Sequence, residues 1–337
     1  MPHVDLSGDP AAVRRIFLSL GLAQEHEEVT AVPLAGGVSS GIYRVDLRSG
    51  SYCVKQALPQ LKAAKEWRVP VERVFSEIDY LRTVDTIVPG HVPRVIGRDD
   101  ATKSFVMEFL GREFRNWKTQ LLAGDVDTQI ASHVGDVLGR IHCATADQSA
   151  IAQRFATDDN FYAIRLEPYL VECSRVHPQL ADSLLGLVTR TAQTRRVLVH
   201  GDVSPKNILT GPHGPVLIDA ECAWFGDPAF DVAFCLNHFL LKAAHLPQHM
   251  GPLMACVSSM TQSYFAHVDW EPTGELEARV TSLLPGLTLA RVDGKSPVEY
   301  LDDPSRDRVR AMAITQLHQP LRSLEVIATK WGENLTS

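Results

Sequence analysis

Val197–Asp231 reads VLVHGDVSPKNILTGPHGPVLIDAECAWFGDPAFD, and its polar residues follow two short apolar runs, VLV and VLI. Runs of this length, bounded by Gly, Pro and Asn, are typical of short buried strands. The loop after the first run carries Asp202 and Asn207, and the second run ends at Asp219. The stretch therefore predicts two strands that present two carboxylates and an amide on neighbouring loops.

These residue types suit phosphoryl transfer. That reaction needs a carboxylate beside the acceptor hydroxyl, and further oxygen ligands for the magnesium ions that bridge the nucleotide phosphates. Asp202 is the candidate for the first role, with Lys206 beside it as a second catalytic candidate, and Asn207 and Asp219 are the candidate metal ligands. The alternative is that Asp202 and Asn207 only cap turns. The ordered occurrence of all these positions favours phosphoryl transfer.

The order of these residues matches a known pattern. Kinase catalytic loops read H-R-D-x-x-x-x-N and are followed by a metal-binding Asp. Here His200-Gly201-Asp202 precedes Asn207 at that spacing, and Asp219 opens Asp-Ala-Glu. This variant resembles the aminoglycoside phosphotransferase and choline kinase superfamily of small-molecule kinases. The resemblance implies an α+β, bilobal, protein-kinase-like fold, with ATP and Mg²⁺ as cofactors.

The same resemblance predicts two lobes. Residues 1–110 would form a small N-lobe with an antiparallel sheet that binds the nucleotide, and residues 111–337 a larger, mainly helical C-lobe. Strand patterns occur at 29–34, 42–47 and 52–57, with a glycine-rich turn after the first. Glycine lets backbone N–H groups approach phosphates closely. The candidate phosphate contacts are Gly36, Gly37, Ser39, Ser40 and, on the third strand, Lys55.

A kinase lysine of this kind pairs with a carboxylate on the following helix. The 71–81 segment has helical periodicity, and both Glu72 and Glu77 are candidates. By analogy we favour Glu77; a solvated acidic helix face is the alternative. Strand patterns at 92–96 and 104–110 then lead to Met107, Glu108 and Leu110, which the resemblance places against adenine.

One segment of the expected N-lobe indicates a narrower family. Lys55-Gln56-Ala57-Leu58-Pro59, followed by Trp67-Arg68-Val69-Pro70, resembles 5-methylthioribose kinase. The middle of the catalytic loop, Val203-Ser204-Pro205-Lys206, departs from that family and is the more common small-molecule-kinase type. A methylthioribose-like sugar is therefore one candidate acceptor. An aminoglycoside or a choline-like amino alcohol is the alternative, and a nucleotide-binding protein without turnover is a further one.

The acceptor is expected to be small. Only eleven residues separate Asp219 from Asp231, and no Ala-Pro-Glu follows, so the activation loop on which a peptide docks has no room. The resemblance makes Asp231 an anchor for the catalytic-loop backbone. The acceptor candidates are Glu221, Trp224 and Asp227, with Tyr162, Arg165 and His238 as weaker ones.

The composition of the chain limits the kinds of partner that we expect it to bind. The chain has 337 residues and a formal net charge of −7, from 33 basic and 40 acidic residues, which argues against nucleic acid and anionic membranes. Six scattered cysteines without a C-x-x-C pair suggest neither a zinc site nor a disulfide framework. With no signal-peptide pattern or membrane-length apolar run, we expect a cytoplasmic enzyme; a homodimer is compatible with these properties.

Helical patterns fill the rest of the chain. We expect a helix over 166–176, short helices and loops over 272–303, where Pro285 and Gly286 interrupt the pattern, and a closing helix over 309–331.

Overall fold

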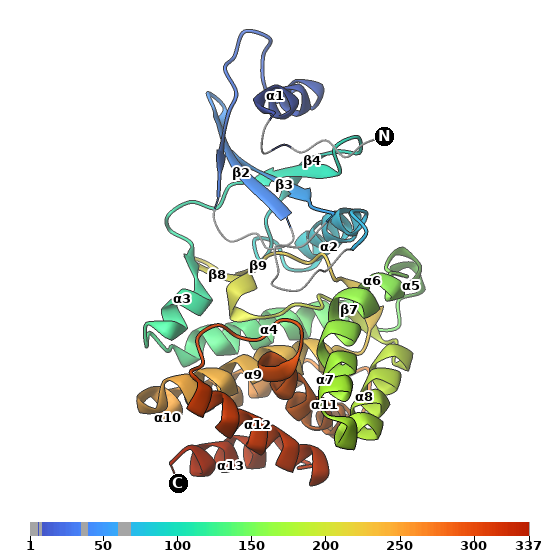
Figure 1. Ribbon diagram of the computed structural model, residues 1–337. Helices are drawn as coiled ribbons and strands as arrows, with labels where there is room; N and C mark the ends of the chain where they lie inside the picture. Colours follow the sequence, from blue (N-terminus) through green and yellow to red (C-terminus); the bar gives the residue numbers. More distant parts are fainter. Residues whose placement is uncertain (1–5, 7–8, 35–39, 60–68, 337) are drawn as a thin grey trace. The chain divides into compact units, whose positions relative to one another are not determined.

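A computed structural model describes residues 6, 9–34, 40–59 and 69–336 (Figure 1). The chain divides into two compact units, Met1–Glu113 and Phe114–Ser337. Gly36, Gly37, Ser39 and Trp67 lie outside the described residues. No helix in the described part of the chain has the length and apolar character needed to cross a membrane.

The first unit is built on a five-stranded antiparallel sheet in the order β1-β2-β3-β5-β4. Alternating side chains place one face of this sheet in the core, where α1 covers it. Asp9 caps α1 through the N–H of Ala12, as its position before Pro10 predicts. The elements are α1 (Pro10–Ser19), β1 (Thr30–Pro33), β2 (Ser40–Leu47), β3 (Gly50–Ala57), α2 (Arg73–Ile87), β4 (Val95–Asp99) and β5 (Ser104–Glu108).

The second unit is mainly helical, with two small antiparallel sheets that carry the catalytic loop. One sheet pairs β10 with β7, and the other has the order β6-β8-β9. Its strands are β6 (Arg115–Asn116), β7 (Val197–Val199), β8 (Ile208–Gly211), β9 (Gly214–Leu217) and β10 (Trp224–Gly226). Its longer helices are α4 (Thr128–Thr145), α8 (Ala181–Gln193), α9 (Pro228–His245), α10 (Met250–Phe265), α11 (Thr273–Asp293), α12 (Asp303–His318) and α13 (Leu324–Thr336).

Short helices connect these elements: α3 (Trp117–Leu122), α5 (Ser149–Arg154), α6 (Asp158–Phe161), α7 (Glu172–Val176) and single 3₁₀ turns at Pro178–Leu180, Pro205–Asn207 and Pro247–His249. Between α6 and α7, Tyr162–Val171 forms a π-helix that contains Pro168. Such bulges often occur at functional sites.

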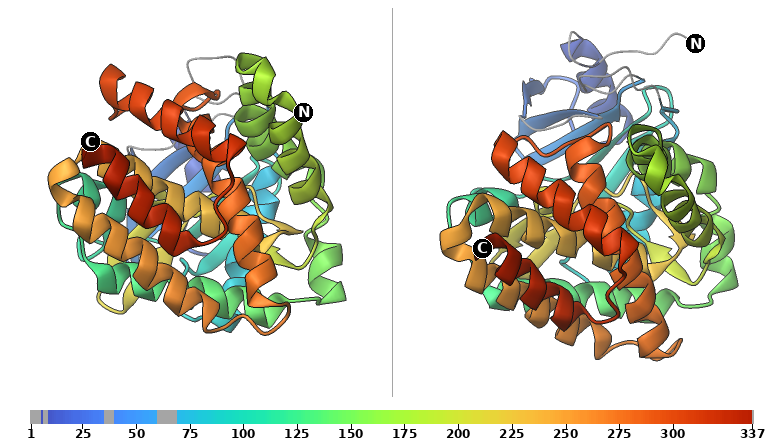
Figure 2. Two further views of the ribbon diagram at one scale, coloured as in Figure 1. Left: turned by 90° about the horizontal axis from the view of Figure 1, so that it is seen from below. Right: turned by 60° about the horizontal axis from the view of Figure 1, so that its bottom comes forward.

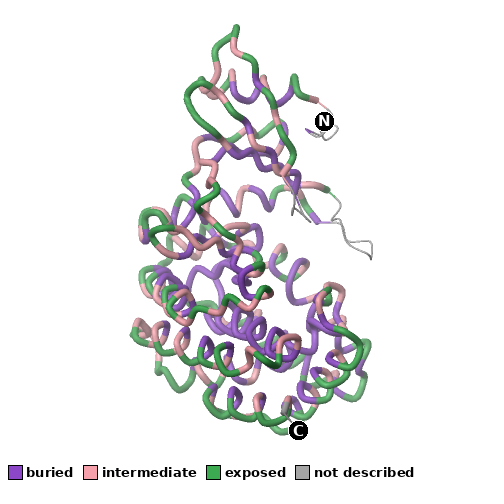
Figure 3. The backbone as a smooth tube through the Cα atoms, turned by 90° about the vertical axis from the view of Figure 1, so that its left-hand side faces the viewer, coloured by how far each residue is buried: buried purple, intermediate pink, exposed green. Residues whose placement is uncertain are grey.

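Helix α9 is the centre of the second unit. Every residue from Pro228 to Ala244 is buried, and α10, α11, α12 and α13 all pack against the helix (Figures 1 and 2). Figure 3 shows the buried stretches gathered inside this unit, with the exposed ones on its outer turns. A helix that is buried all round is normally apolar throughout. The polar side chains of α9 therefore need a specific explanation.

Two helix expectations are wrong in the C-terminal third. Residues 273–293 form one continuous helix, α11, despite Pro285, because packing against α9 and α12 outweighs the bond that the proline removes. The expected 309–331 helix is instead two helices, with the break at Gln319-Pro320. Pro320 restricts the residue before it to extended conformations, which ends α12 there.

Candidate active site

The catalytic loop is anchored by its backbone to a buried carboxylate. Asp231, in the first turn of α9, accepts the N–H of His200 at 2.7 Å and the N–H of Gly201 at 2.8 Å. Gly201 has φ +78, and a Cβ there would lie 2.7 Å from the carbonyl oxygen of Cys222. Only glycine fits this backbone conformation and this close approach. The expected anchoring role of Asp231 agrees with these contacts.

His200 braces the loop from inside. Its Nδ1 accepts the N–H of Asp202 at 3.1 Å, so the ring proton lies on Nε2, which faces the carbonyl of Ile218 at 3.2 Å. Burial lowers the pKa of His200, which keeps the ring neutral. His200 thus holds the backbone of Asp202 to the strand that delivers Asp219.

The two carboxylate oxygens of Asp202 differ in their contacts. Its Oδ2 contacts Nη2 of Arg165 at 2.6 Å and Nζ of Lys206 at 3.1 Å. Burial opposes ionisation, but the charges of Arg165 and Lys206 prevail and lower the pKa of Asp202. Its Oδ1 is buried and has no hydrogen-bond partner among the described residues. The carboxylate is therefore ionised at neutral pH, with one oxygen available for a hydroxyl group.

Lys206 is half exposed, with 47% of its side chain accessible. Desolvation disfavours its charged form, but Asp202 and Asp219 outweigh that effect and raise the pKa of Lys206. The ammonium therefore stays charged beside the catalytic carboxylate.

The two candidate metal ligands come from neighbouring strands. Asn207 precedes β8 and Asp219 follows β9, and the N–H of Ile218 donates to the carbonyl of Asn207 at 3.0 Å. The amide of Asn207 is oriented by its bond to the carbonyl of Asp202, at 3.1 Å. Asp219 has φ +66, an uncommon conformation for a residue with a Cβ that is found preferentially at functional sites.

This donor set fits Mg²⁺. No group of three or more His, Cys, Asp or Glu side chains in the described ranges could hold a metal ion by itself. Magnesium in nucleotide sites is usually held by only one or two carboxylates together with substrate phosphates and water. An amide oxygen from Asn207 and a carboxylate from Asp219 meet that requirement.

Arg165 is the site residue that sequence reasoning undervalued. It lies on the π-helix with only 5% of its surface exposed, and it also donates from Nε to the carbonyl of Gly201 at 2.5 Å. Burial opposes its charge, but Asp202 raises the pKa of Arg165 above its ordinary value. No spacing pattern in the sequence indicates this contact, because Arg165 and Asp202 are 37 positions apart and only the tertiary fold brings them together.

The side chains of two of the three acceptor candidates make contacts within the protein. Trp224 is 1% exposed and stacks on Phe161, with ring centroids 4.3 Å apart. Asp227 caps α9 by accepting a hydrogen bond from the N–H of Ala229, and its Oδ1 lies 3.1 Å from Nε of Arg279. Burial raises the pKa of Asp227. These contacts favour structural roles for both.

Glu221, the third acceptor candidate, is 5% exposed. Its carbonyl accepts Nδ2 of Asn160 at 2.7 Å, which holds the segment just after Asp219 in place. Glu221 therefore remains our candidate for contact with a metal or an acceptor.

In the first unit, the lysine of β3 pairs with Glu77. Lys55 Nζ lies 2.8 Å from Oε1 and 2.7 Å from Oε2, and both residues are buried. Glu72 is instead 62% exposed, 3.9 Å from Lys103. Ser40 begins β2 opposite Ala57, two residues along β3 from Lys55.

The expected adenine contacts lie at the end of β5. Met107 is 9% exposed and pairs with Cys53 of β3. The N–H of Glu108 donates to the carbonyl of Arg94 at 3.0 Å, so it is not available to a base. Leu110 follows the strand, outside the sheet ladder.

Comparison with known proteins identifies the class. Solved structures of kinases share the fold: Plasmodium vivax ethanolamine kinase has a TM-score of 0.56 at 11% identity, covering 100% of this chain and 95% of that one. An amicoumacin kinase in complex with AMP-PNP, Ca²⁺ and Ami has a TM-score of 0.55 at 16% identity, covering 94% and 97%. The expected α+β, protein-kinase-like fold is confirmed.

The phosphotransferase enzyme family model matches residues 30–246, and the chain belongs to that family. Methylthioribose kinase of Pectobacterium atrosepticum is 25% identical over 263 residues, 69% of this chain and 65% of the relative. Methylthioribose kinase of Klebsiella pneumoniae is 26% identical over 280 residues, 74% of this chain and 69% of the relative. The chain thus matches about two thirds of the length of these relatives.

Proposed function

We propose that this protein is an ATP- and Mg²⁺-dependent kinase that phosphorylates a hydroxyl group of a small metabolite. The observation that supports this most is Asp202, which is ionised by Arg165 and Lys206 and keeps one buried oxygen unpaired. Membership of a phosphotransferase family supports the same reaction class.

In this proposal Asp202 Oδ1 accepts a hydrogen bond from the acceptor hydroxyl and orients its oxygen toward the γ-phosphorus. A bond forms between that oxygen and phosphorus, the bond to the β–γ bridging oxygen breaks, and ADP leaves. The hydroxyl proton passes to Asp202 late, because a loose transition state needs little base strength. The low pKa of Asp202 is compatible with that late transfer.

Other residues position the nucleotide. Asn207 and Asp219 would hold Mg²⁺, which neutralises charge on the phosphates as the bond breaks. Lys55, oriented by Glu77, would contact the phosphates, with Ser40 and the residues Gly36, Gly37 and Ser39 as backbone donors. The carbonyl of Glu108 and the N–H of Leu110 would meet adenine, with Met107 behind it.

The acceptor is a methylthioribose-like sugar in our first proposal, since two methylthioribose kinases are among the relatives. An aminoglycoside or a choline-like amino alcohol is the second candidate. All six cysteines are free thiols, which suits the reducing cytoplasm we propose as its location.

The test is Mg²⁺-dependent ADP release with a panel of thio- and deoxyribose sugars, aminoglycosides, choline analogues and hydroxy amino acids. We expect release with one acceptor class and none when EDTA removes the metal. Tight AMP-PNP binding with no ADP release across the whole panel would instead indicate a nucleotide-binding protein without turnover.

A further inference from the structure

Helix α9 contains a buried lysine without a carboxylate partner. Lys242 is 1% exposed, and its ammonium lies 5.3 Å from the ring centroid of Tyr300. Within the described ranges this ring is its interaction partner, and Lys242 makes no hydrogen bond or ion pair. A buried charge without a partner is costly, so such a group either has a shifted pKa or pairs with another charged group or a ligand.

Its surroundings add positive charge. Burial, together with the charges of Lys118 of α3 and Arg291 of α11, lowers the pKa of Lys242 to about 7, against opposing effects of Cys235 and Glu299. Glu299 is already the partner of Lys118. Three cationic side chains thus share one carboxylate.

Polar side-chain atoms around Lys242 also lack hydrogen-bond partners. Nε2 of His238, Nε of Arg291 and Oη of Tyr300 are buried and lack a hydrogen-bond partner among the residues described. Burial raises the pKa of Tyr300, so its phenol stays protonated and can donate. Burial also lowers the pKa of His238, which leaves a neutral ring with one N–H. Unused donors beside an unpaired ammonium are a suitable environment for an oxyanion.

This group of side chains is connected to the catalytic carboxylate. Phe234, His238 and Lys242 are spaced by four and share one face of α9. The guanidinium of Arg165, which holds Asp202, lies 5.8 Å from the ring centroid of Phe234, and that ring lies 5.6 Å from His238.

A second path leads through Tyr169 of the π-helix. Its hydroxyl accepts Nη1 of Arg291 at 3.2 Å, and its ring centroid lies 5.9 Å from the guanidinium of Arg165. The charge of Lys206 also acts on His238. The cations and the catalytic loop are therefore linked through packed side chains of the second unit.

We propose that Lys242, Arg291, His238 and Tyr300 form an anion subsite, and that it binds a carboxylate or phosphate group of the acceptor while the acceptor hydroxyl faces Asp202. This inference rests on the proposed kinase function, and it replaces the neutral methylthioribose-like sugar, which has neither group, by an acidic acceptor. A choline-like or aminoglycoside acceptor would bring positive charge to a place that already holds unpaired cations. Like charges at close range oppose binding.

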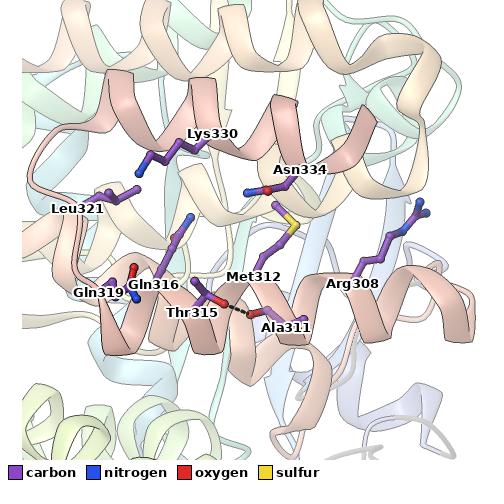
Figure 4. A pocket seen from close by; sticks show the side chains of 9 residues that line it. All are labelled: Arg308, Ala311, Met312, Thr315, Gln316, Gln319, Leu321, Lys330 and Asn334. Atoms are coloured by element: carbon purple, nitrogen blue, oxygen red, sulfur yellow. Dashed lines mark hydrogen bonds between the residues drawn. The ribbon is translucent and has the colours of Figure 1, made fainter. Parts of the chain in front are cut away.

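A pocket elsewhere in this unit does not compete with this assignment. Figure 4 shows side chains from α12, the segment after it and α13 that line a pocket sharing no residue with the catalytic loop or α9. Its cations, Arg308 and Lys330, are exposed. Solvated cations need no ligand, whereas Lys242 is removed from water.

The binding test uses sulfate, acetate and tetramethylammonium as probes, on enzyme saturated with AMP-PNP and Mg²⁺ at constant ionic strength. We expect sulfate or acetate to raise the melting temperature saturably, and tetramethylammonium to have no effect. The variant Lys242→Met should weaken the anion affinity about 10- to 100-fold, as expected when a charged hydrogen-bond partner is lost. Lys330→Met, a matched change in the same unit, should leave it unchanged.

A larger response to sulfate would indicate a phosphate group on the acceptor, and a larger response to acetate a carboxylate. Equal anion responses in wild type and Lys242→Met, no saturable response, or stabilisation by tetramethylammonium would overturn the subsite. If Lys242→Met did not fold, Tyr300→Phe would serve instead, with an expected loss of about threefold to tenfold in anion affinity.

Turnover then separates the two proposals. ADP release is measured with matched acceptor pairs, glycerate against glycerol and ribose 5-phosphate against ribose, and with choline. Preference for the acidic member, lost in Lys242→Met with the KM for ATP unchanged, supports the subsite. Phosphorylation of choline or of neutral members alone would refute the subsite and leave the kinase proposal intact. Absence of ADP release with every acceptor, beside normal anion binding, would count against the kinase proposal alone.

Discussion

Two buried lysines, one in each unit, differ in what neutralises them. Lys55 lies in β3 with both carboxylate oxygens of Glu77 within 2.8 Å. Lys242 lies in α9 at a similar degree of burial, with an aromatic ring and two further cations nearby, and the carboxylate that acts on it, Glu299, is paired with Lys118. The first charge is satisfied within the protein. The anion-subsite proposal assigns the second to a charge on the acceptor.

Removal of the proposed base should have the largest effect. Asp202→Ala should reduce kcat by about 10³-fold or more, because the acceptor hydroxyl loses its orientation and its proton acceptor. Measuring both ADP release and AMP-PNP affinity separates loss of turnover from loss of nucleotide binding. The affinity should stay within a few-fold of wild type. Asp202→Asn is the matched control for charge. If Asp202→Ala kept normal turnover, Asp202 would not be the base.

Breaking the satisfied pair should destabilise the protein. Glu77→Gln leaves the ammonium of Lys55 buried beside a neutral group, and loss of one partner of a buried pair costs about 3–5 kcal/mol. Urea unfolding should show that loss. The double variant Lys55→Met/Glu77→Gln should recover part of it, which a purely additive pair of effects would not.

Lys242→Met should instead stabilise the folded protein. In the absence of ligand, replacing an unpartnered buried ammonium by an apolar side chain should raise the free energy of unfolding by about 1–3 kcal/mol. The folded pKa of Lys242, about 7, lies below the ordinary value of 10.5, so the unfolded state binds more protons between these pH values. Wild-type stability should therefore rise relative to the variant from pH 7 to about 10.

Urea unfolding of both proteins across this pH range tests the sign. A destabilised Lys242→Met variant would mean that the ammonium has an internal partner, as Lys55 has.

The smallest expected effect concerns the pH profile. Arg165 lowers the pKa of Asp202, so Arg165→Met should raise that pKa. Since Asp202 must be ionised, the acidic limb of the kcat/KM profile should move to higher pH by about one unit. Arg190→Met, on the exposed face of α8, is the control. An unshifted limb would show that Arg165 only supports the loop backbone through Gly201.

Much of this site could be predicted because its residues lie close together in the chain. Asp202 and Asn207 are five residues apart and Asp219 follows on the next hairpin, so spacing alone indicates their proximity. The choice between Glu72 and Glu77 could not be made that way. It depends on the rotation of α2 against the sheet, which buries Glu77 and exposes Glu72.

Helix boundaries in the C-terminal third show a similar limit. Pro285 is a helix breaker by local preference, yet α11 continues through it because the helix is buried against α9 and α12. Local preference amounts to a few kcal/mol, which the burial of several large side chains can exceed.

Local order in the chain thus predicts the family, the phosphate chemistry and the residues of the catalytic loop, because hairpins and short loops keep nearby residues together. The roles of Arg165 and Lys242 depend on tertiary structure. Arg165 meets Asp202 from a π-helix 37 positions away, and Lys242 is one more cation in an apolar helix until Lys118 of α3 and Arg291 of α11 are brought near it. Burial is decided by that packing, and burial is what lowers the pKa of Lys242 far below that of an ordinary solvated lysine.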